Sequence, residues 1–386
     1  MARLRALAIP LGDALTTLLP SLQGVLDGHE AAFTPVGPDT DPSALTALRV
    51  GDPIGDDIAL VVATSGTTGI PKGALLTGTS LVASATATHD RLGGPGSWLL
   101  ALPPHHIAGI QVLVRSLVSG TAPVQLDVAT GFDVTRLPAA VAALGSGRRY
   151  TSLVATQLAK ALAVPASAAA LAELDAVLLG GGPAPQPILD TAAAAGVRVV
   201  RTYGMSETAG GCVYDGVPLP GVRLRIGDDG RIRVGGPTLA QGYRNPVEPD
   251  PFAEPGWFTT NDLGTLDSSG CLTVLGRADD AISTGGLTVL PGPVEAVLST
   301  HPAVAECAVF GIDDDRLGQR VVAAVVVAGV TPPTLEELRA HVAESLDITA
   351  APREVHVVAA LPRRGIGKLD RKALAQQFSA EGIAPN

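Results

Sequence analysis

The segment from Thr64 to Gly73, TSGTTGIPKG, combines glycines, hydroxyl side chains and one lysine. Glycines let backbone amides approach an anion, and Ser, Thr and Lys72 can donate hydrogen bonds to phosphate oxygens. The GxxxxGK[ST] spacing of the P-loop is absent. An ordinary flexible turn is the alternative, but it does not explain so many hydroxyls directly after an apolar run. The segment predicts a site for a polyphosphate.

Lysine is rare in this chain. Only four of its 27 Lys and Arg residues are lysines, at positions 72, 160, 368 and 372. Lys72 and Lys368 both lie in Gly-rich segments, where a compact ammonium group differs chemically from a planar guanidinium. We expect both to act on charged substrate groups, although Lys368 could also be an exposed lysine of the C-terminal tail.

A second polar cluster, Thr202 to Thr208 (TYGMSET), also follows an apolar run, and Leu179 to Pro183 (LGGGP) ends another. An aromatic ring beside glycines can stack on a base, and Thr208 can donate to a phosphate. Glu207 offers the carboxylate that Mg²⁺ prefers, with an acidic residue placed favourably at a helix N-terminus as the alternative. These two segments are expected to face one crevice.

Two further polar segments follow, Thr260 to Gly264 (TNDLG) and Gly276 to Asp280 (GRADD). Asp262 could accept hydrogen bonds from ribose hydroxyls. Taken alone, each segment is only a polar turn.

The elements that must position these residues are short apolar runs separated by stretches of helical length: Ile58 to Thr64, Trp98 to Leu102, Asp175 to Leu179 and Val197 to Thr202. This rhythm predicts layered α/β structure. Because the runs are continuously apolar, we expect strands of parallel sheets covered on both faces, with functional residues in the loops at their ends.

The pattern changes in the last third of the chain. From about Gly221 short strand-like pieces and tight turns predict a β-rich subdomain, and a new α+β unit follows Arg277. In that unit, Val294 to Ser299 and Leu335 to Leu346 are expected helices, and Val304 to Phe310 and Val321 to Val327 expected strands. We place a boundary near Asp279. The predicted domains are 1–278, which would carry the polar segments from Thr64 to Arg277, and 279–386, which would carry Lys368.

Composition excludes several classes of protein. A net charge of -10 leaves no overall basic surface for nucleic acid. No run approaches the 18 or more apolar residues of a membrane helix. The three cysteines are isolated and form no CxxC pair, which argues against a disulfide framework or a zinc site. We expect a soluble cytoplasmic protein.

Five segments in this order, TSGTTGIPKG, YGMSET, TNDLG, GRADD and the C-terminal LPRRGIGKLDRKAL, carry a resemblance to a known family. They closely resemble the adenylate-forming superfamily of acyl-CoA synthetases, adenylation domains and luciferases. The resemblance runs from about Ile58 to Ala373. It implies a large α/β domain with a β-rich subdomain and a small mobile α+β C-terminal domain. It also implies an enzyme that uses ATP, Mg²⁺ and coenzyme A to make an acyl-adenylate and then a thioester.

The resemblance assigns roles in the large domain. Glu207 would hold Mg²⁺, Thr208 would contact the α-phosphate, Asp262 would hold the ribose and Arg277 would assist it. The ATP phosphates would be bound by Thr64, Ser65, Gly66, Thr67, Thr68, Gly69 and Lys72, and the adenine would be bordered by Gly181, Gly182, Pro183, Tyr203, Gly204 and Met205.

The C-terminal roles follow from the same resemblance. Lys368 would stabilise charge as the carboxylate attacks the α-phosphorus. Asp279 would be the hinge about which the small domain turns, and Gly285 and Gly286 would border the coenzyme A channel. Homodimerisation is an expectation of the family only.

The acid is harder to predict. Within the family the chain most resembles the o-succinylbenzoate-CoA ligases of menaquinone biosynthesis. His106, Gly210 and Gly211 would line the acid pocket. Arg115 would bind the second carboxylate, unless it is a solvated helix residue. A ligase for another aryl or fatty acid, or a catalytically idle nucleotide-binding protein of the same fold, are the alternatives.

Overall fold

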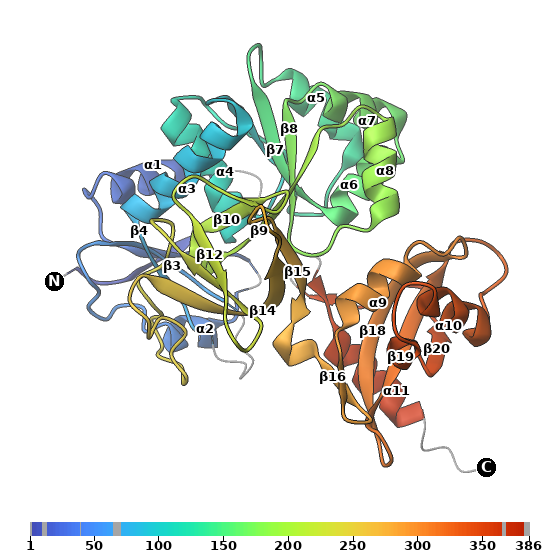
Figure 1. Cartoon of the computed structure of the whole chain (residues 1–386). Coiled ribbons are helices and arrows are strands. Elements are labelled where there is room, and N and C mark those ends of the chain that lie inside the picture. Colours follow the sequence, from blue (N-terminus) through green and yellow to red (C-terminus); the bar gives the residue numbers. More distant parts are fainter. Residues whose placement is uncertain (1, 10–13, 39, 65–70, 365–367, 382–386) are drawn as a thin grey trace.

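The computed structural model describes residues 2–9, 14–38, 40–64, 71–364 and 368–381. Four sheets and a short hairpin make up its β-structure (Figure 1). The first sheet has the order β1-β2-β3-β4, with β4 antiparallel to β3 and the others parallel. Its elements are β1 (Arg5–Ala8), α1 (Ala14–Leu26), β2 (Phe33–Val36), α2 (Pro42–Ala47), β3 (Ile58–Val62) and β4 (Ala74–Thr77).

Strand β3 is covered on both faces, as its continuously apolar sequence predicts. All five residues are buried; Leu60 and Val62 join one hydrophobic cluster while Ile58 and Val61 join another. Strand β3 pairs in parallel with β2, as expected, whereas its other partner β4 is antiparallel. The chain turns back directly after the phosphate-loop segment and therefore pairs beside β3.

The second sheet has seven strands in the order β11-β10-β9-β8-β7-β5-β6, parallel from β6 to β9. Strands β10 and β11 are antiparallel. Its strands are β5 (Ser97–Leu100), β6 (Val124–Gln125), β7 (Arg149–Val154), β8 (Ala176–Gly180), β9 (Val199–Met205), β10 (Gly210–Tyr214) and β11 (Val217–Pro218).

Helices cover both faces of this sheet, because its side chains alternate between two clusters. Trp98 and Leu100 face the cluster that contains α3 (Gly78–Leu92) and α4 (Ile107–Ser119). Leu99 faces the other cluster. The helices on that side are α5 (Leu137–Ala142), α6 (Ala155–Leu162), α7 (Pro165–Ala172) and α8 (Gln186–Ala194), with the 3₁₀ turn η1 (Val134–Arg136). Layered α/β structure is confirmed.

The predicted β-rich subdomain is confirmed as an antiparallel sheet of β12 (Arg223–Ile226), β13 (Arg231–Gly235), β14 (Trp257–Leu266) and β15 (Leu272–Arg277). Two expected loops are strands instead. Asp262 lies within β14 because that strand continues to pair with β15 at Arg277. Tyr203 to Met205 form the end of β9 because β10 pairs back onto them.

The C-terminal part has its own core on both faces of a five-stranded sheet. Helices α9 (Pro291–Leu298) and α10 (Leu335–Ala343) pack on one face, and α11 (Arg371–Glu381) packs on the other. Figure 1 shows this part beside the large part, next to β15. The remaining elements are η2 (Ser206–Thr208), η3 (Ala278–Asp280), β16 (Ile282–Thr284), β17 (Leu287–Val289), β18 (Val304–Asp314), β19 (Gly318–Val327), η4 (Ile348–Ala350), β20 (Glu354–Val357), β21 (Arg363–Arg364) and β22 (Lys368–Leu369).

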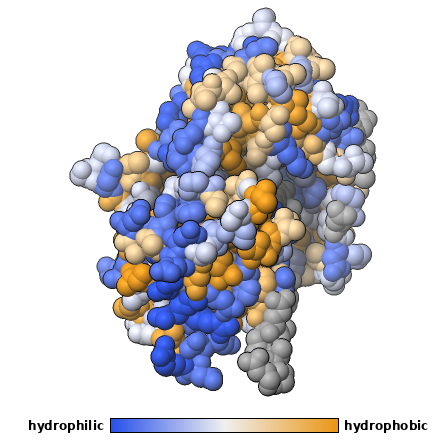
Figure 2. Space-filling view, turned by 90° about the vertical axis from the view of Figure 1, so that its right-hand side faces the viewer, coloured by the Kyte–Doolittle hydropathy of each residue, from blue (hydrophilic) through white to orange (hydrophobic). Residues whose placement is uncertain are grey.

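Figure 2 looks onto the side of the molecule that carries this part, where hydrophilic residues predominate and hydrophobic residues form smaller groups. Within the described ranges, every helix falls short of the length and apolar content that crossing a bilayer requires.

Candidate active site

The phosphate-loop segment is described at its two ends. Ser65, Gly66, Thr67, Thr68 and Gly69 lie outside the described residues.

Thr64 and Lys72 face each other across the base of the segment, where the Lys72 amide donates to the Thr64 carbonyl at 3.4 Å. The segment around residue 245 clamps this base, since Asn245 Nδ2 donates to the Pro71 carbonyl at 2.8 Å. The Thr64 hydroxyl is buried and has no hydrogen-bond partner among the described residues. That hydroxyl is free to bind a ligand oxygen.

Lys72 and Glu207 lie on two sides of Tyr243. The Lys72 ammonium is 5.2 Å from the centre of the Tyr243 ring, and the Tyr243 hydroxyl donates to Glu207 Oε1 at 2.6 Å. Burial, and then the neighbouring Glu207 carboxylate, raise the pKa of Tyr243, so its phenol remains a donor. Glu207 itself is 8% exposed. The structure therefore brings together a cation and a carboxylate that are far apart in sequence.

Sequence reasoning missed Tyr243. The available signal was an aromatic residue directly after Gly242 in a polar stretch.

Thr208 is fully buried, and its hydroxyl belongs to the turn that follows β9. It donates to the Gly210 carbonyl at 2.7 Å or the Met205 carbonyl at 3.1 Å, and it accepts from the Met205 amide at 3.0 Å. A hydroxyl has one proton to donate. Donation from Thr208 to a phosphate therefore requires that one of these backbone bonds be exchanged.

Asp262 joins the end of β9 to the end of the β-rich sheet. The Tyr203 hydroxyl donates to Asp262 Oδ2 at 2.8 Å, and Arg277 lies 3.5 Å from Asp262 Oδ1. Burial and the Asp262 carboxylate raise the pKa of Tyr203, which keeps the phenol protonated. Arg277 also donates to both carboxylate oxygens of Asp279, at 2.8 and 3.0 Å. A single arginine thus connects the predicted ribose residue to the predicted hinge.

Gly181, Gly182 and Pro183 directly follow β8, which pairs in parallel with β9. They therefore lie beside the end of β9, where Tyr203, Gly204 and Met205 are located. Gly181 has a φ of +88°, a backbone conformation that a residue without Cβ adopts freely. The two segments form adjacent walls, as the sequence predicts.

The predicted acid-pocket residues converge on α4 and β10. His106 is the N-cap of α4, and a side chain at Gly210 would come within 3.0 Å of Gln111 on that helix. A side chain at Gly211 would meet the Tyr214 ring at 2.7 Å. Because both positions are glycine, β10 can lie close to Gln111 and Tyr214.

Arg115 is not a solvated helix residue, since it is only 3% exposed. Its guanidinium donates to the hydroxyls of Tyr214 at 3.3 Å and Ser152 at 3.5 Å, and it lies 4.9 Å from the Trp98 ring. Among the described residues it has no carboxylate partner. Arg115 and Gly211 thus both adjoin the side chain of Tyr214.

The candidate site residues of the C-terminal part lie in three separate elements of its structure. Lys368 is in β22, paired with Arg364 of β21, and its side chain is outside what the structure describes. Gly285 and Gly286 form the turn between β16 and β17, with φ values of +57° and +81°. Asp279 lies in η3 between the two parts.

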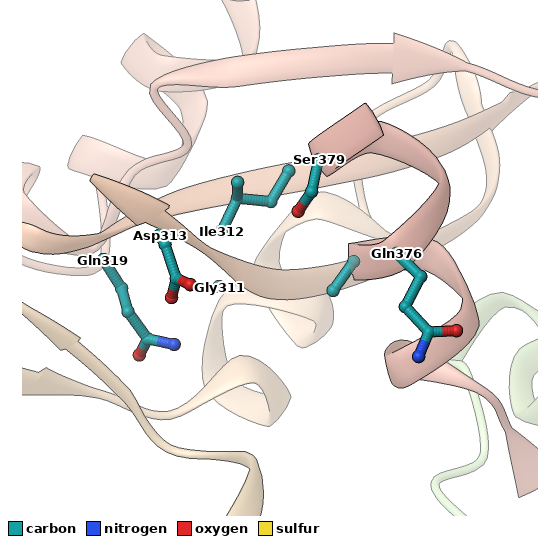
Figure 3. Close-up of a pocket in the computed structure, with 7 residues that line it drawn as sticks. Gly311, Ile312, Asp313, Gln319, Gln376 and Ser379 are labelled. Carbon is teal, nitrogen blue, oxygen red and sulfur yellow. The ribbon is translucent and has the colours of Figure 1, made fainter. Parts of the chain in front are cut away.

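A cavity of about 530 Å³ lies elsewhere, between β18, β19 and α11. Asp313 and Gln319 on the strands and Gln376 and Ser379 on the helix line it (Figure 3). It contains none of the predicted site residues.

The chain belongs to the family of AMP-binding enzymes. Residues 14–244 match the AMP-binding enzyme model, and residues 293–368 match the model of the C-terminal domain of these enzymes. The predicted superfamily and fold class are both confirmed.

Particular relatives are more specific. A probable 2-succinylbenzoate–CoA ligase of Mycobacterium tuberculosis is 71% identical over 381 residues, which cover 98% of this chain and 99% of that protein. A 2-succinylbenzoate–CoA ligase of a Geobacillus species is 36% identical over 347 residues, 83% of this chain and 69% of the relative.

Solved structures of o-succinylbenzoate CoA synthetase are also similar to this chain. The o-succinylbenzoate CoA synthetase of Bacillus subtilis, in complex with its acyl-adenylate intermediate, is 28% identical with a TM-score of 0.74, covering 97% of this chain and 88% of that one. The same enzyme with ATP and magnesium ion gives a TM-score of 0.77 at 28% identity, over 96% and 89% of the two chains.

Proposed function

We propose that this protein is an ATP-dependent 2-succinylbenzoate–CoA ligase, acting in menaquinone biosynthesis. The observation that carries the proposal is the 71% identity, across 98% of the chain, to a probable ligase for this acid. The geometry of the site supports the same chemistry, since Tyr243 links Lys72 to the buried carboxylate of Glu207, and Tyr203 donates to Asp262.

The reaction has two steps. A carboxylate oxygen of the acid attacks the α-phosphorus of ATP, the bond to the β-phosphate oxygen breaks, and pyrophosphate leaves. The coenzyme A thiol then attacks the acyl carbon, AMP leaves and one proton is released. Neither step needs a nucleophile from the protein, so its contribution is to position the reactants and to neutralise charge.

The residue roles predicted above are part of this proposal. Thr64 and Lys72 bind phosphate oxygens, Tyr203 and the turn at Gly181 to Pro183 border the adenine, and Asp262 accepts from the ribose. Lys368 neutralises charge during adenylation, and the chain turns about Asp279 between the two steps.

Glu207 is the proposed ligand of Mg²⁺. Among the described residues no group of three or more His, Cys, Asp and Glu could hold a metal. One buried carboxylate beside Lys72 fits an ion whose other ligands are phosphate oxygens and water, which is the usual environment of Mg²⁺.

Arg115 is proposed to favour an acid that carries a second carboxylate. It is a buried cation without an acidic partner among the described residues, and it acts through Tyr214 and the Gly211 wall. Substituting Arg115 by Met should raise the KM for 2-succinylbenzoate more than the KM for a monocarboxylic aryl acid.

We also propose that the domain boundary lies between residues 278 and 279. The protein is further proposed to be cytoplasmic and to form a homodimer. The separate hydrophobic clusters of the C-terminal part support the boundary.

The test is mass-spectrometric detection of products from the purified protein with ATP, Mg²⁺, coenzyme A and a panel of acids. A 2-succinylbenzoyl thioester together with AMP supports the proposal. Turnover of a different acid only would keep the reaction and overturn the substrate. No turnover across the panel would favour a catalytically idle protein of this fold.

A further inference from the structure

Asp279 and Asp280 are neighbours in η3, but their carboxylates bind opposite parts of the molecule. Asp279 accepts both hydrogen bonds from Arg277 at the end of β15, on the side of the large part. Asp280 accepts from Arg371 Nη1 at 3.0 Å, on the side of the C-terminal part. Asp279 is therefore tied to the end of β15, and Asp280 to α11 of the C-terminal part.

Arg371 is the first residue of α11 and joins four elements. Its Nη2 donates to both oxygens of Glu295 on α9 at 2.8 Å, and its Nε donates to the Val309 carbonyl on β18 at 3.1 Å. Glu295 also accepts from the Val309 amide at 2.8 Å. The side chains of Arg371 and Glu295 are 20% and 13% exposed. A bidentate pair so little exposed fixes geometry more firmly than a pair on the open surface.

The same arginine lies three residues after Lys368. The hairpin that carries Lys368 closes where the Asp370 amide donates to the Pro362 carbonyl at 2.9 Å. Asp370 Oδ1 then accepts from the Ala373 amide at 3.0 Å in the first turn of α11. The hairpin thus runs directly into the first turn of α11, which Arg371 anchors to α9 and β18.

We propose that Arg371 is a positioning residue for adenylation, since it holds the Lys368 hairpin and Asp280 in one rigid body. When the chain turns about Asp279, this body carries Lys368 to a fixed place relative to the ATP phosphates. The inference rests on the proposed function, because it needs Lys368 to act in the first step.

The experiment measures the two steps separately. Single-turnover adenylate formation is followed with ATP and 2-succinylbenzoate, and thioester formation is followed with preformed adenylate and coenzyme A. The variants are Arg371→Gln and Asp280→Asn. The matched control is Arg320→Gln, which removes a 2.9 Å ion pair with Glu354. Arg320 lies in the C-terminal sheet away from the hairpin, and its side chain is 25% exposed.

Arg371→Gln should slow adenylation at least about tenfold, because misplacement of a catalytic group by a fraction of an ångström has effects of this size. Thioester formation and the KM for ATP should change by less than about threefold, a split that general loss of stability would not produce. Asp280→Asn, which keeps the Glu295 anchor, should give a smaller loss in the same step.

Equal losses in both steps, or the same losses in Arg320→Gln, would overturn the inference. If Arg371→Gln does not fold, the step-specific loss in Asp280→Asn decides. Wild-type protein that forms no adenylate overturns the proposed function and this inference with it, whereas an active wild type with unaffected variants overturns this inference alone.

Discussion

The two sides of the candidate site are built differently. On the large side, Tyr203, Asp262 and Glu207 are held by hydrogen bonds of 2.6 to 2.8 Å between strands and turns of the fold. On the small side, Lys368 is on a two-residue strand whose hairpin is anchored through Arg371. In the proposed mechanism, the large side is a fixed receptor for the nucleotide, and the small side carries a cation that is brought to it and removed. One site can then run two chemical steps in turn.

Removal of the cation should have the largest effect. Lys368→Ala should slow adenylate formation by about 10²- to 10³-fold, the usual result of losing one group that stabilises transition-state charge. The affinity for ATP, measured by calorimetry, should be nearly unchanged, because the receptor is on the other side. Lys160→Ala, at an exposed position of α6, is the matched control. Unchanged adenylation in Lys368→Ala would refute the role of this lysine.

Substitutions on the large side should instead weaken the binding of ATP. Asp262→Ala should weaken ATP binding by about 10- to 100-fold, since a hydrogen bond to a charged group contributes about 1.5 to 3 kcal/mol. Tyr203→Phe, which removes one partner of Asp262, should have a smaller effect in the same direction. Calorimetric titration with ATP measures both. An ATP affinity that both variants leave intact would mean that the nucleotide binds elsewhere.

The link between Glu207 and Lys72 should appear in the requirement for Mg²⁺. Tyr243→Phe removes the hydrogen bond to Glu207 and should shift the Mg²⁺ concentration for half-maximal adenylation by about fivefold, which corresponds to the roughly 1 kcal/mol of a typical hydrogen bond. Tyr150→Phe provides the control, because its hydroxyl donates to the Gly94 carbonyl at 3.0 Å, away from the site. Identical Mg²⁺ curves for wild type and Tyr243→Phe would remove Tyr243 from the account.

The last effect concerns pH and the stability of the large part rather than the reaction. Burial, and then the nearby Arg115 cation, lower the pKa of His89 from 6.5 to about 4. The unfolded chain therefore binds more protons in this window, so the contribution of neutral His89 is present above pH 6.5 and is lost as pH falls towards 4. A shift of this size corresponds to a loss of about 3 kcal/mol across the window.

Denaturant titrations at several pH values measure this contribution. His89→Gln, whose amide oxygen can still accept from the Trp98 indole, should have a weaker dependence of stability on pH between 6.5 and 4. The same slope in both proteins would show that His89 does not titrate as described.

Most residues of the candidate site were proposed from the sequence alone. Continuously apolar runs predict strands that are buried on both faces. Polar segments directly after these runs predict where ligands bind. The pairing of strands could not be predicted. Asp262 lies within β14 and Tyr203 within β9 because partner strands extend them.

The contacts missed from the sequence join residues far apart along the chain. Tyr243 binds a carboxylate 36 residues away, and Arg371 binds one 91 residues away. Such contacts are set by how the sheets and the C-terminal part pack, which no local pattern reports. The burial of Arg115 was unpredictable for the same reason, since one helix sequence does not show which neighbours cover it.

The central claim is that the carboxylate of the acid attacks the α-phosphorus of ATP. It is tested most directly with 2-succinylbenzoate whose carboxylate oxygens are labelled with ¹⁸O, incubated with ATP, Mg²⁺ and coenzyme A. The account predicts AMP that carries one ¹⁸O on its phosphate, with unlabelled pyrophosphate. Unlabelled AMP, or label in inorganic phosphate together with ADP, would contradict it.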